Sequence, residues 1–189
     1  MEEDRVDRLV EDFKSLRPDI DPRNKAVAAR LLHLSDLVQR YYGAIGERFD
    51  VSLSGFGVLT ALARSAPREL TLAEVNRDIL VTSGGITFLA ARLEKQGLVT
   101  KRPHPSDGRA VLIKLTRRGR QVADQLIDAV ALADVAALAH LSIGDLRTAD
   151  ELLMRLQAGI ESAISRGFSS GGNAADDRRT YAKGRSGTR

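Results

Sequence analysis

One stretch of this chain, residues 70–116, restricts the possible folds more than any other part of the sequence. It opens with a short amphipathic segment, residues 72–80, and continues after a tight connection with a second one, residues 83–96. Thr82 is a good N-cap for the second segment, and Gly97 is a natural stop at its end. The pattern therefore predicts two successive helices joined by a turn.

Two runs rich in Leu, Val and Ile follow, residues 98–102 and 110–115, and the polar segment 104–108 separates them. Short apolar runs on either side of a polar turn predict a β-hairpin. Helix, turn, helix and hairpin in this order are the elements of a winged helix-turn-helix, in which the hairpin is the wing. An ordinary hairpin turn is the alternative explanation of Asp107-Gly108, because Asp-Gly turns are common in all proteins.

Amphipathic helices are predicted on both sides of this stretch. Apolar side chains recur at three- and four-residue steps over residues 2–16, 24–49, 117–140 and 143–164. Ser52 or Ser54 can cap a further helix that continues to Ala63. Because helices with such wide apolar stripes need partners, we expect the outer helices to form a dimerisation region.

These patterns predict a mainly α-helical fold with a small β-hairpin wing. We expect N-terminal helices that contribute to dimerisation and to a pocket wall, a winged helix-turn-helix lobe that binds DNA, C-terminal dimerisation helices and a disordered tail. These four segments are expected at residues 1–50, 51–116, 117–166 and 167–189.

The charge of the chain suits an anionic partner such as nucleic acid. The formal net charge is +4 and the sequence pI is about 9.7. In and just after the wing, basic residues are opposed only by Asp107 before Asp124 is reached; they are Lys101, Arg102, Arg109, Lys114, Arg117, Arg118 and Arg120. We therefore expect a phosphate-binding face at the wing.

Several classes of function lack support in the sequence. The chain has no Cys, which rules out disulfides, thiolate zinc sites and a cysteine-based oxidation sensor. Neither His33 nor His140 belongs to a cluster with zinc spacing, and no phosphate loop or nucleophile elbow is present. We expect no metal, no cofactor and no enzymatic activity. Without a signal-peptide pattern or an apolar run long enough for a membrane span, we expect a cytoplasmic protein with no membrane partner.

The chain from about residue 52 to residue 119 resembles the MarR (multiple-antibiotic-resistance regulator) family of winged-helix regulators. The resemblance rests on Leu70–Val75, Val81–Thr87, Arg92–Val99 and Arg102–Thr116. The family's wing signature is Asp, any residue, Arg, then an apolar strand and Leu-Thr, and it is matched by Asp107, Arg109, Leu115 and Thr116. The resemblance implies that Arg109 enters the minor groove while Asp107 holds its guanidinium in place.

The resemblance also implies that the second helix of the motif lies in the major groove. Its start can present Thr82, Ser83 and Thr87 to the bases. Gly84 and Gly85 would permit a close approach of the backbone to DNA, and a frayed first turn is the alternative explanation of this glycine pair.

The other expected DNA contacts are Ser54, Arg102, His104 and Ser106. Members of the family often carry polar or basic residues where this chain has Phe88, Leu89 and Ala90. We therefore expect few direct base contacts from this helix and a larger share of sequence reading through the wing and DNA shape.

The extra N-terminal helix, residues 2–17, matches a branch of the family in which some members sense urate. That branch carries Trp where this chain has Phe13 and Asp where it has Gly57, so groups that would orient a polar purine are missing and urate is not the expected ligand. Another ligand pocket could form where the first two helices meet the lobe, lined by Phe13, His33, Leu37, Tyr41, Phe56 and Val58. Core packing is the alternative role of each of these residues.

We therefore expect a sequence-specific transcription regulator, a repressor, that binds double-stranded DNA. It should act as a homodimer on a palindromic operator whose half-sites are about one helical turn apart, and a small-molecule effector should release it. A winged-helix module that binds a protein instead of specific DNA is the alternative, since winged folds serve both purposes.

Overall fold

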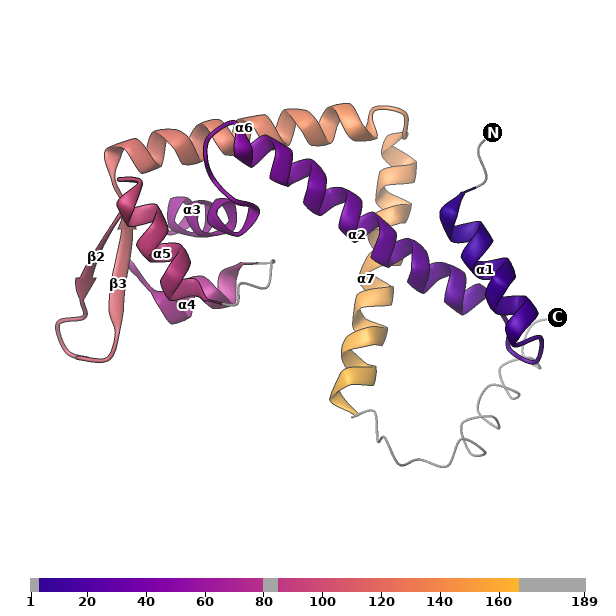
Figure 1. Cartoon of the computed structure of the whole chain (residues 1–189). Coiled ribbons are helices and arrows are strands. Elements are labelled where there is room, and N and C mark those ends of the chain that lie inside the picture. The colour runs from indigo at the N-terminus through magenta and orange to yellow at the C-terminus, as the bar shows by residue number, and fades with distance from the viewer. Residues whose placement is uncertain (1–3, 80–84, 167–189) are drawn as a thin grey trace. The chain divides into compact units, whose positions relative to one another are not determined.

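The structure is a computed structural model that describes residues 4–79 and 85–166 (Figure 1). Over these residues the elements follow one another as α1 (Arg5–Leu16), α2 (Arg23–Glu47), α3 (Leu53–Ser65), β1 (Leu70–Thr71), α4 (Leu72–Asp78), α5 (Ile86–Lys95), β2 (Val99–Pro103), β3 (Val111–Leu115), α6 (Arg117–Leu138) and α7 (Ile143–Ser165). The chain divides into two compact units, Met1–Ala136 and Ala137–Arg189. The predicted fold, mainly α-helical with a small β wing, is confirmed.

The strands form one antiparallel sheet in the order β1-β3-β2. β2 and β3 are the predicted hairpin, and their register places Val99 opposite Leu115. The sequence analysis missed β1, in which Leu70 pairs with Ile113. Two residues are too few to show the alternation of apolar and polar side chains by which a strand is recognised.

The core of the first unit joins the sheet to the helices around it. Its largest fully buried side chains come from α3, α4, α6 and the strands: Val58, Leu59, Leu70, Val75, Val99, Ile113 and Leu126. Burial of one such side chain contributes about 1.5–3 kcal/mol relative to leaving it in water. The wing and α5 are therefore mounted on a common core, to which α5 adds Ala90 and Leu93.

α6 approaches the sheet closely at its first turn. A Cβ built on Gly119 would lie 1.8 Å from the carbonyl oxygen of Leu98, so a larger residue would require the backbone to move. Thr116 caps this helix as predicted, because its hydroxyl accepts a hydrogen bond from the N–H of Gly119 at 2.9 Å. The same hydroxyl donates to the carbonyl of Gly97 at 2.7 Å and so joins α6 to the end of α5.

Two tyrosines of α2 hold that helix against α6 within the first unit. Tyr41 donates to the carbonyl of Ala133 at 3.0 Å, and Tyr42 donates to Oδ1 of Asp134 at 2.7 Å. Burial, followed by the hydrogen bond to Asp134, raises the pKa of Tyr42 to about 12. The Tyr42 hydroxyl therefore remains a donor at neutral pH.

α5 begins later than the sequence analysis predicted. Its first helical residue is Ile86, and Gly85 before it has a φ of 111°, a left-handed conformation that interrupts a right-handed helix. The described helix thus begins three residues after the predicted start at residue 83, and Thr82, the predicted N-cap, lies outside the described residues with the rest of residues 80–84. The helix ends as predicted, with Gly97 in the left-handed region at φ 70°.

The second unit contains the end of α6 and the whole of α7. Ser142 caps α7 as predicted: its hydroxyl accepts from the N–H of Asp145 at 3.1 Å, and the Asp145 carboxylate accepts from the N–H of Ser142 at 3.0 Å. Among the described helices none is by itself long and apolar enough to cross a membrane; α6 and α7 have that length and composition only as a bent pair.

Candidate nucleic-acid interface

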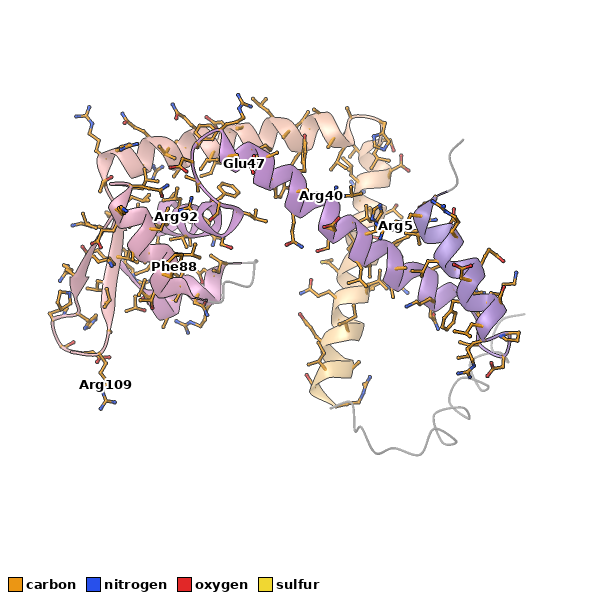
Figure 2. The ribbon with its side chains drawn as sticks, in the orientation of Figure 1. Arg5, Arg40, Glu47, Phe88, Arg92 and Arg109 are labelled. Atoms are coloured by element: carbon orange, nitrogen blue, oxygen red, sulfur yellow. The ribbon has the colours of Figure 1, made fainter. Side chains whose placement is uncertain are left out.

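α5 turns one face to the core and the other to solvent. Ala90 and Leu93 are 0% and 2% exposed, whereas Thr87 and Phe88 are exposed. Phe88 has 74% of its surface accessible (Figure 2). Of the three apolar residues that distinguish this helix in the sequence, Ala90 and the half-buried Leu89 face inward and Phe88 faces outward.

The preceding helices are fixed by caps at their first turns. Thr71 and Glu74 form a capping box, in which the Glu74 N–H donates to the Thr71 hydroxyl at 3.1 Å and the Thr71 N–H donates to the Glu74 carboxylate at 2.7 Å. The Thr71 N–H and then the Thr71 hydroxyl, which both donate to the Glu74 carboxylate, hold the pKa of Glu74 below its usual value. Ser52 caps α3 by accepting from the N–H of Gly55 at 3.2 Å, so Ser54, a predicted DNA contact, lies half-buried in the first turn of α3.

The wing tip is a hydrogen-bonded loop from which Arg109 projects. Oδ1 of Asp107 accepts from the backbone N–H of Arg109 at 3.0 Å, and the Asp107 carbonyl accepts from the N–H of Ala110 at 3.0 Å. Nδ1 of His104 accepts from the N–H of Ser106 at 3.3 Å. Arg109 itself is exposed, and its side chain extends away from the tip in Figure 2.

The expected pairing of Asp107 with the Arg109 guanidinium is not formed. The Asp107 carboxylate accepts the N–H two residues along the chain, as aspartates commonly do in turns, and so it shapes the backbone of the wing tip. Within residues 4–79 and 85–166 no carboxylate forms an ion pair with Arg109. The guanidinium is thus open to a partner from outside the chain.

Carboxylates from distant parts of the sequence neutralise several wing cations. Glu69, just before β1, accepts from Nε of Arg102 at 2.8 Å and lies 3.1 Å from Nζ of Lys114. Arg102 and then Lys114, through these hydrogen bonds, hold the pKa of Glu69 below its usual value. Glu94 of α5 lies 2.9 Å from Nζ of Lys101. Asp107 is the acidic residue within this stretch of sequence, but the carboxylates that pair with Lys101, Arg102 and Lys114 come from outside the stretch.

The remaining cations of the cluster lie on α6. Arg120 pairs with Asp124 at 3.0 Å, and Arg118 donates to the carbonyl of Gln96 at 3.1 Å. In the part of the chain that the structure describes, Arg109 and Arg117 are the cluster members without an ion pair or hydrogen bond from their side chains. Asp124, the partner of Arg120, can be read from the local sequence, whereas the groups that pair with Lys101, Arg102, Lys114 and Arg118 come from other parts of the fold.

The other predicted DNA contacts are placed unevenly by the structure. Thr87 is exposed in the first turn of α5, and Gly85 is exposed directly before it. Thr82, Ser83 and Gly84 lie outside the described residues. On the hairpin, the predicted contacts Arg102, His104, Ser106, Asp107 and Arg109 all lie on β2 or the loop that follows it.

The predicted pocket residues lie on three helices, α1, α2 and α3. Val58 has no exposed surface and Phe56 packs against the same core, because both belong to α3. The others lie on α1 and α2: Phe13, His33, Leu37 and Tyr41. Val58 is therefore a core residue and is not accessible to a ligand in this structure.

A hollow of about 370 Å³ lies elsewhere, where α2 meets α3. It is lined by Gly43, Glu47, Asp50, Val51, Ser52, Leu53 and Arg92. At its edge the side-chain amide of Gln96 donates to the Asp50 carbonyl at 2.6 Å and to its carboxylate at 3.0 Å, and Arg92 lies 3.6 Å from the same carboxylate. These contacts tie the joint between α2 and α3 directly to α5.

Both units expose large apolar faces. In the first unit these belong mainly to α1 and α2: Leu9, Leu16, Val27, Leu32, Leu34, Leu37 and Val38. In the second unit they belong mainly to α7: Ile143, Leu152, Leu153, Met154, Ile160 and Ile164. Apolar surface of this extent is typical of an interaction site.

Comparison with known proteins agrees with this architecture. The MarR family model matches residues 49–110. The uncharacterized HTH-type transcriptional regulator YkoM of Bacillus subtilis strain 168 is 31% identical over 108 residues, which are 57% of this chain and 67% of that protein.

Solved structures of two such regulators are also similar. A mutant MarR from E. coli complexed with operator DNA has a TM-score of 0.60 and 26% identity, covering 72% of this chain and 99% of that chain. The PcaV transcriptional regulator from Streptomyces coelicolor, in complex with its natural ligand, has a TM-score of 0.55 and 25% identity, covering 67% of this chain and 90% of that chain.

Proposed function

Because the chain belongs to the MarR family of transcription regulators, we propose that it is a repressor that binds a palindromic operator as a homodimer. The observation that carries this proposal is the wing, where Arg109 has no ion pair among the described residues while Arg102 and Lys101 are held by carboxylates. An unpaired guanidinium on an exposed turn is suited to the minor groove, which attracts Arg when it is narrow. In this arrangement α5 lies in the major groove with Thr87 near the bases.

The exposed apolar faces support the homodimer. In this proposal residues 51–116 bind DNA, and residues 1–50 and 117–166 associate with a second copy so that the faces of α1, α2 and α7 leave water. Two-fold symmetry then presents two lobes to two half-sites about one helical turn apart, which makes the operator an imperfect palindrome.

We also propose that a small-molecule effector releases the operator, as a ligand is bound by the similar regulator PcaV. An effector can act only if it binds the DNA-competent and incompetent states with different affinities. The contacts of Asp50 with Gln96 and Arg92 supply a path, because a ligand that shifts α2 also shifts the helix that reads DNA. The proposed ligand contacts are Phe13 on α1 and His33 on α2, which lie on the helices outside the DNA-binding lobe.

The test is a salt titration of DNA binding by the full-length protein and by Arg109→Ala. The probe is a duplex of the protein's own promoter region, with random duplex of equal length as competitor. Loss of the cation that each lobe places in the minor groove should weaken binding at every salt concentration. Because one positive charge fewer then lies among the phosphates of each half-site, the slope of log K against log salt should fall by at most about 0.9 per lobe. The exposed position of Arg109 predicts unchanged folding.

Arg40→Ala is the matched control, because it removes the same charge from α2, where Arg40 lies 3.0 Å from Asp36. Equal effects of the two substitutions would refute the role of Arg109 in the groove. Equal competition by promoter and random duplex would refute sequence-specific regulation, and no binding to either would favour the protein-binding alternative.

A further inference from the structure

We infer that Phe88 reads the 5-methyl group of a thymine in each operator half-site. The inference rests on the proposed DNA-binding function and names one chemical group that the interface recognises. It explains why an aromatic side chain stands on the outer face of the helix that faces DNA.

The exposure of Phe88 is unusual for the lobe that carries it. Among the described residues between 42 and 131, Phe88 is the only large apolar side chain that is exposed, at 74%. The other exposed large apolar residues in the described ranges belong to α1, α2, α6 or α7, the helices outside the lobe. The proposed homodimer accounts for the exposed apolar residues of the outer helices, but it does not account for Phe88, which lies in the DNA-binding lobe.

Packing within α5 keeps Phe88 outside. Ala90 and Leu93 fill the inner face of the helix and are 0% and 2% exposed. Phe88 is the third residue of α5, within the first turn, and Thr87 beside it is exposed as well. The first turn of the second helix is the part of a helix-turn-helix that contacts base edges.

The chemistry of the side chain selects one feature of the base pairs. A phenyl ring has no hydrogen-bond donor or acceptor to offer the polar edges that distinguish the other bases. The thymine methyl is the apolar group in the major groove, and Phe is one of the side chains that contact it. Arg92 and Lys95 follow Phe88 by four and seven residues, so they share its face of the helix, and both are exposed, Arg92 beside Asp50. Cations on this face suit DNA better than an apolar protein partner.

The experiment compares thymine with uracil, which differ only in this methyl group. A binding duplex is first selected from random sequence with the full-length protein, and each thymine is then replaced singly by deoxyuridine. At one symmetric position per half-site we expect the wild-type affinity to fall about fourfold per methyl, the value of one buried apolar carbon. Phe88→Ala should bind both duplexes equally, and Phe88→Leu should retain most of the discrimination.

The outcomes separate this inference from the function on which it rests. If no sequence is enriched, the proposed function fails and the inference fails with it. If a specific duplex is found but wild type binds its thymine and uracil forms equally, only the inference is overturned. A loss on deoxyuridine that is equally large in Phe88→Ala also overturns it, because another residue then reads the methyl. The melting temperature of Phe88→Ala should match wild type, since the side chain contributes little to the core.

Discussion

Replacing Glu69 with Gln should tighten DNA binding, although it removes two ion pairs from the protein. The Glu69 carboxylate holds both Arg102, through Nε at 2.8 Å, and Lys114, at 3.1 Å. Gln keeps the size and polarity of the side chain but carries no charge. Arg102 and Lys114 are more than half exposed, at 53% and 55%, so they remain hydrated and are free to turn towards phosphate groups.

The size of the effect follows from the number of cations released. Each cation that newly pairs with a phosphate steepens the slope of log K against log salt by about 0.9, so the two cations of both lobes add up to about 3.6. Between 50 and 200 mM salt, an added slope of that size corresponds to about a hundredfold additional loss of affinity. The strongest gain in binding is therefore expected at low salt. Because the pKa of Glu69 lies below its usual value of 4.5, mild acid does not produce the same release.

The assay is a fluorescence-anisotropy titration of labelled promoter duplex at several salt concentrations, with wild type and Glu69→Gln. Asp7→Asn is the control, because it makes the same change in net charge at α1, where Asp7 lies 2.5 Å from Arg30. A Glu69→Gln protein with an unchanged slope, or one that binds more weakly than wild type at low salt, would refute the argument. An equal gain in Asp7→Asn would show that net charge alone is responsible.

Two further predictions concern stability. Gly119→Ala should lower the free energy of unfolding by at least about 1–3 kcal/mol, because the new Cβ would meet the Leu98 carbonyl oxygen at 1.8 Å. Gly43→Ala in α2, where the new Cβ would meet no atom within 4 Å, should instead stabilise the protein by about 0.5–1 kcal/mol. Similar urea midpoints for the two variants would contradict the close approach of Gly119 to the Leu98 carbonyl. The pKa values of Glu74 and Asp145 are lowered by hydrogen bonds within their capping boxes, chiefly from the Thr71 N–H and the Ser142 hydroxyl. The stabilisation that these two carboxylates give the folded protein is complete above their unfolded pKa values of 4.5 and 3.8, and it is lost as the pH falls through their folded values. In thermal unfolding, Glu74→Gln should therefore lose less stability than wild type between pH 7 and pH 3.

The candidate site was predictable from the sequence where its features are local. The hairpin and the exposed wing tip follow from residues close together in the chain, and so does the end of α5 at Gly97. The resemblance identified Arg109, but it also predicted an ion pair with Asp107 that the turn geometry replaces with a hydrogen bond to the backbone. The left-handed backbone of Gly85, directly before the described helix begins at Ile86, has no signal in the local sequence, since a glycine also fits a right-handed helix.

The sequence by itself determined the order of the helices, the β-hairpin and several of the helix caps. Ser52, Thr116 and Ser142 each bond to an N–H three residues along, and contacts this short are encoded in the local sequence. The tertiary structure alone decided which cations of the wing strands are neutralised by Glu69 and which apolar residue of α5 is exposed. Arg102 meets Glu69 across 33 positions, and Phe88 is left in solvent beside two inward-facing residues of equal apolar character. Such outcomes depend on which surfaces the folded chain brings together, and no local pattern of residues specifies them.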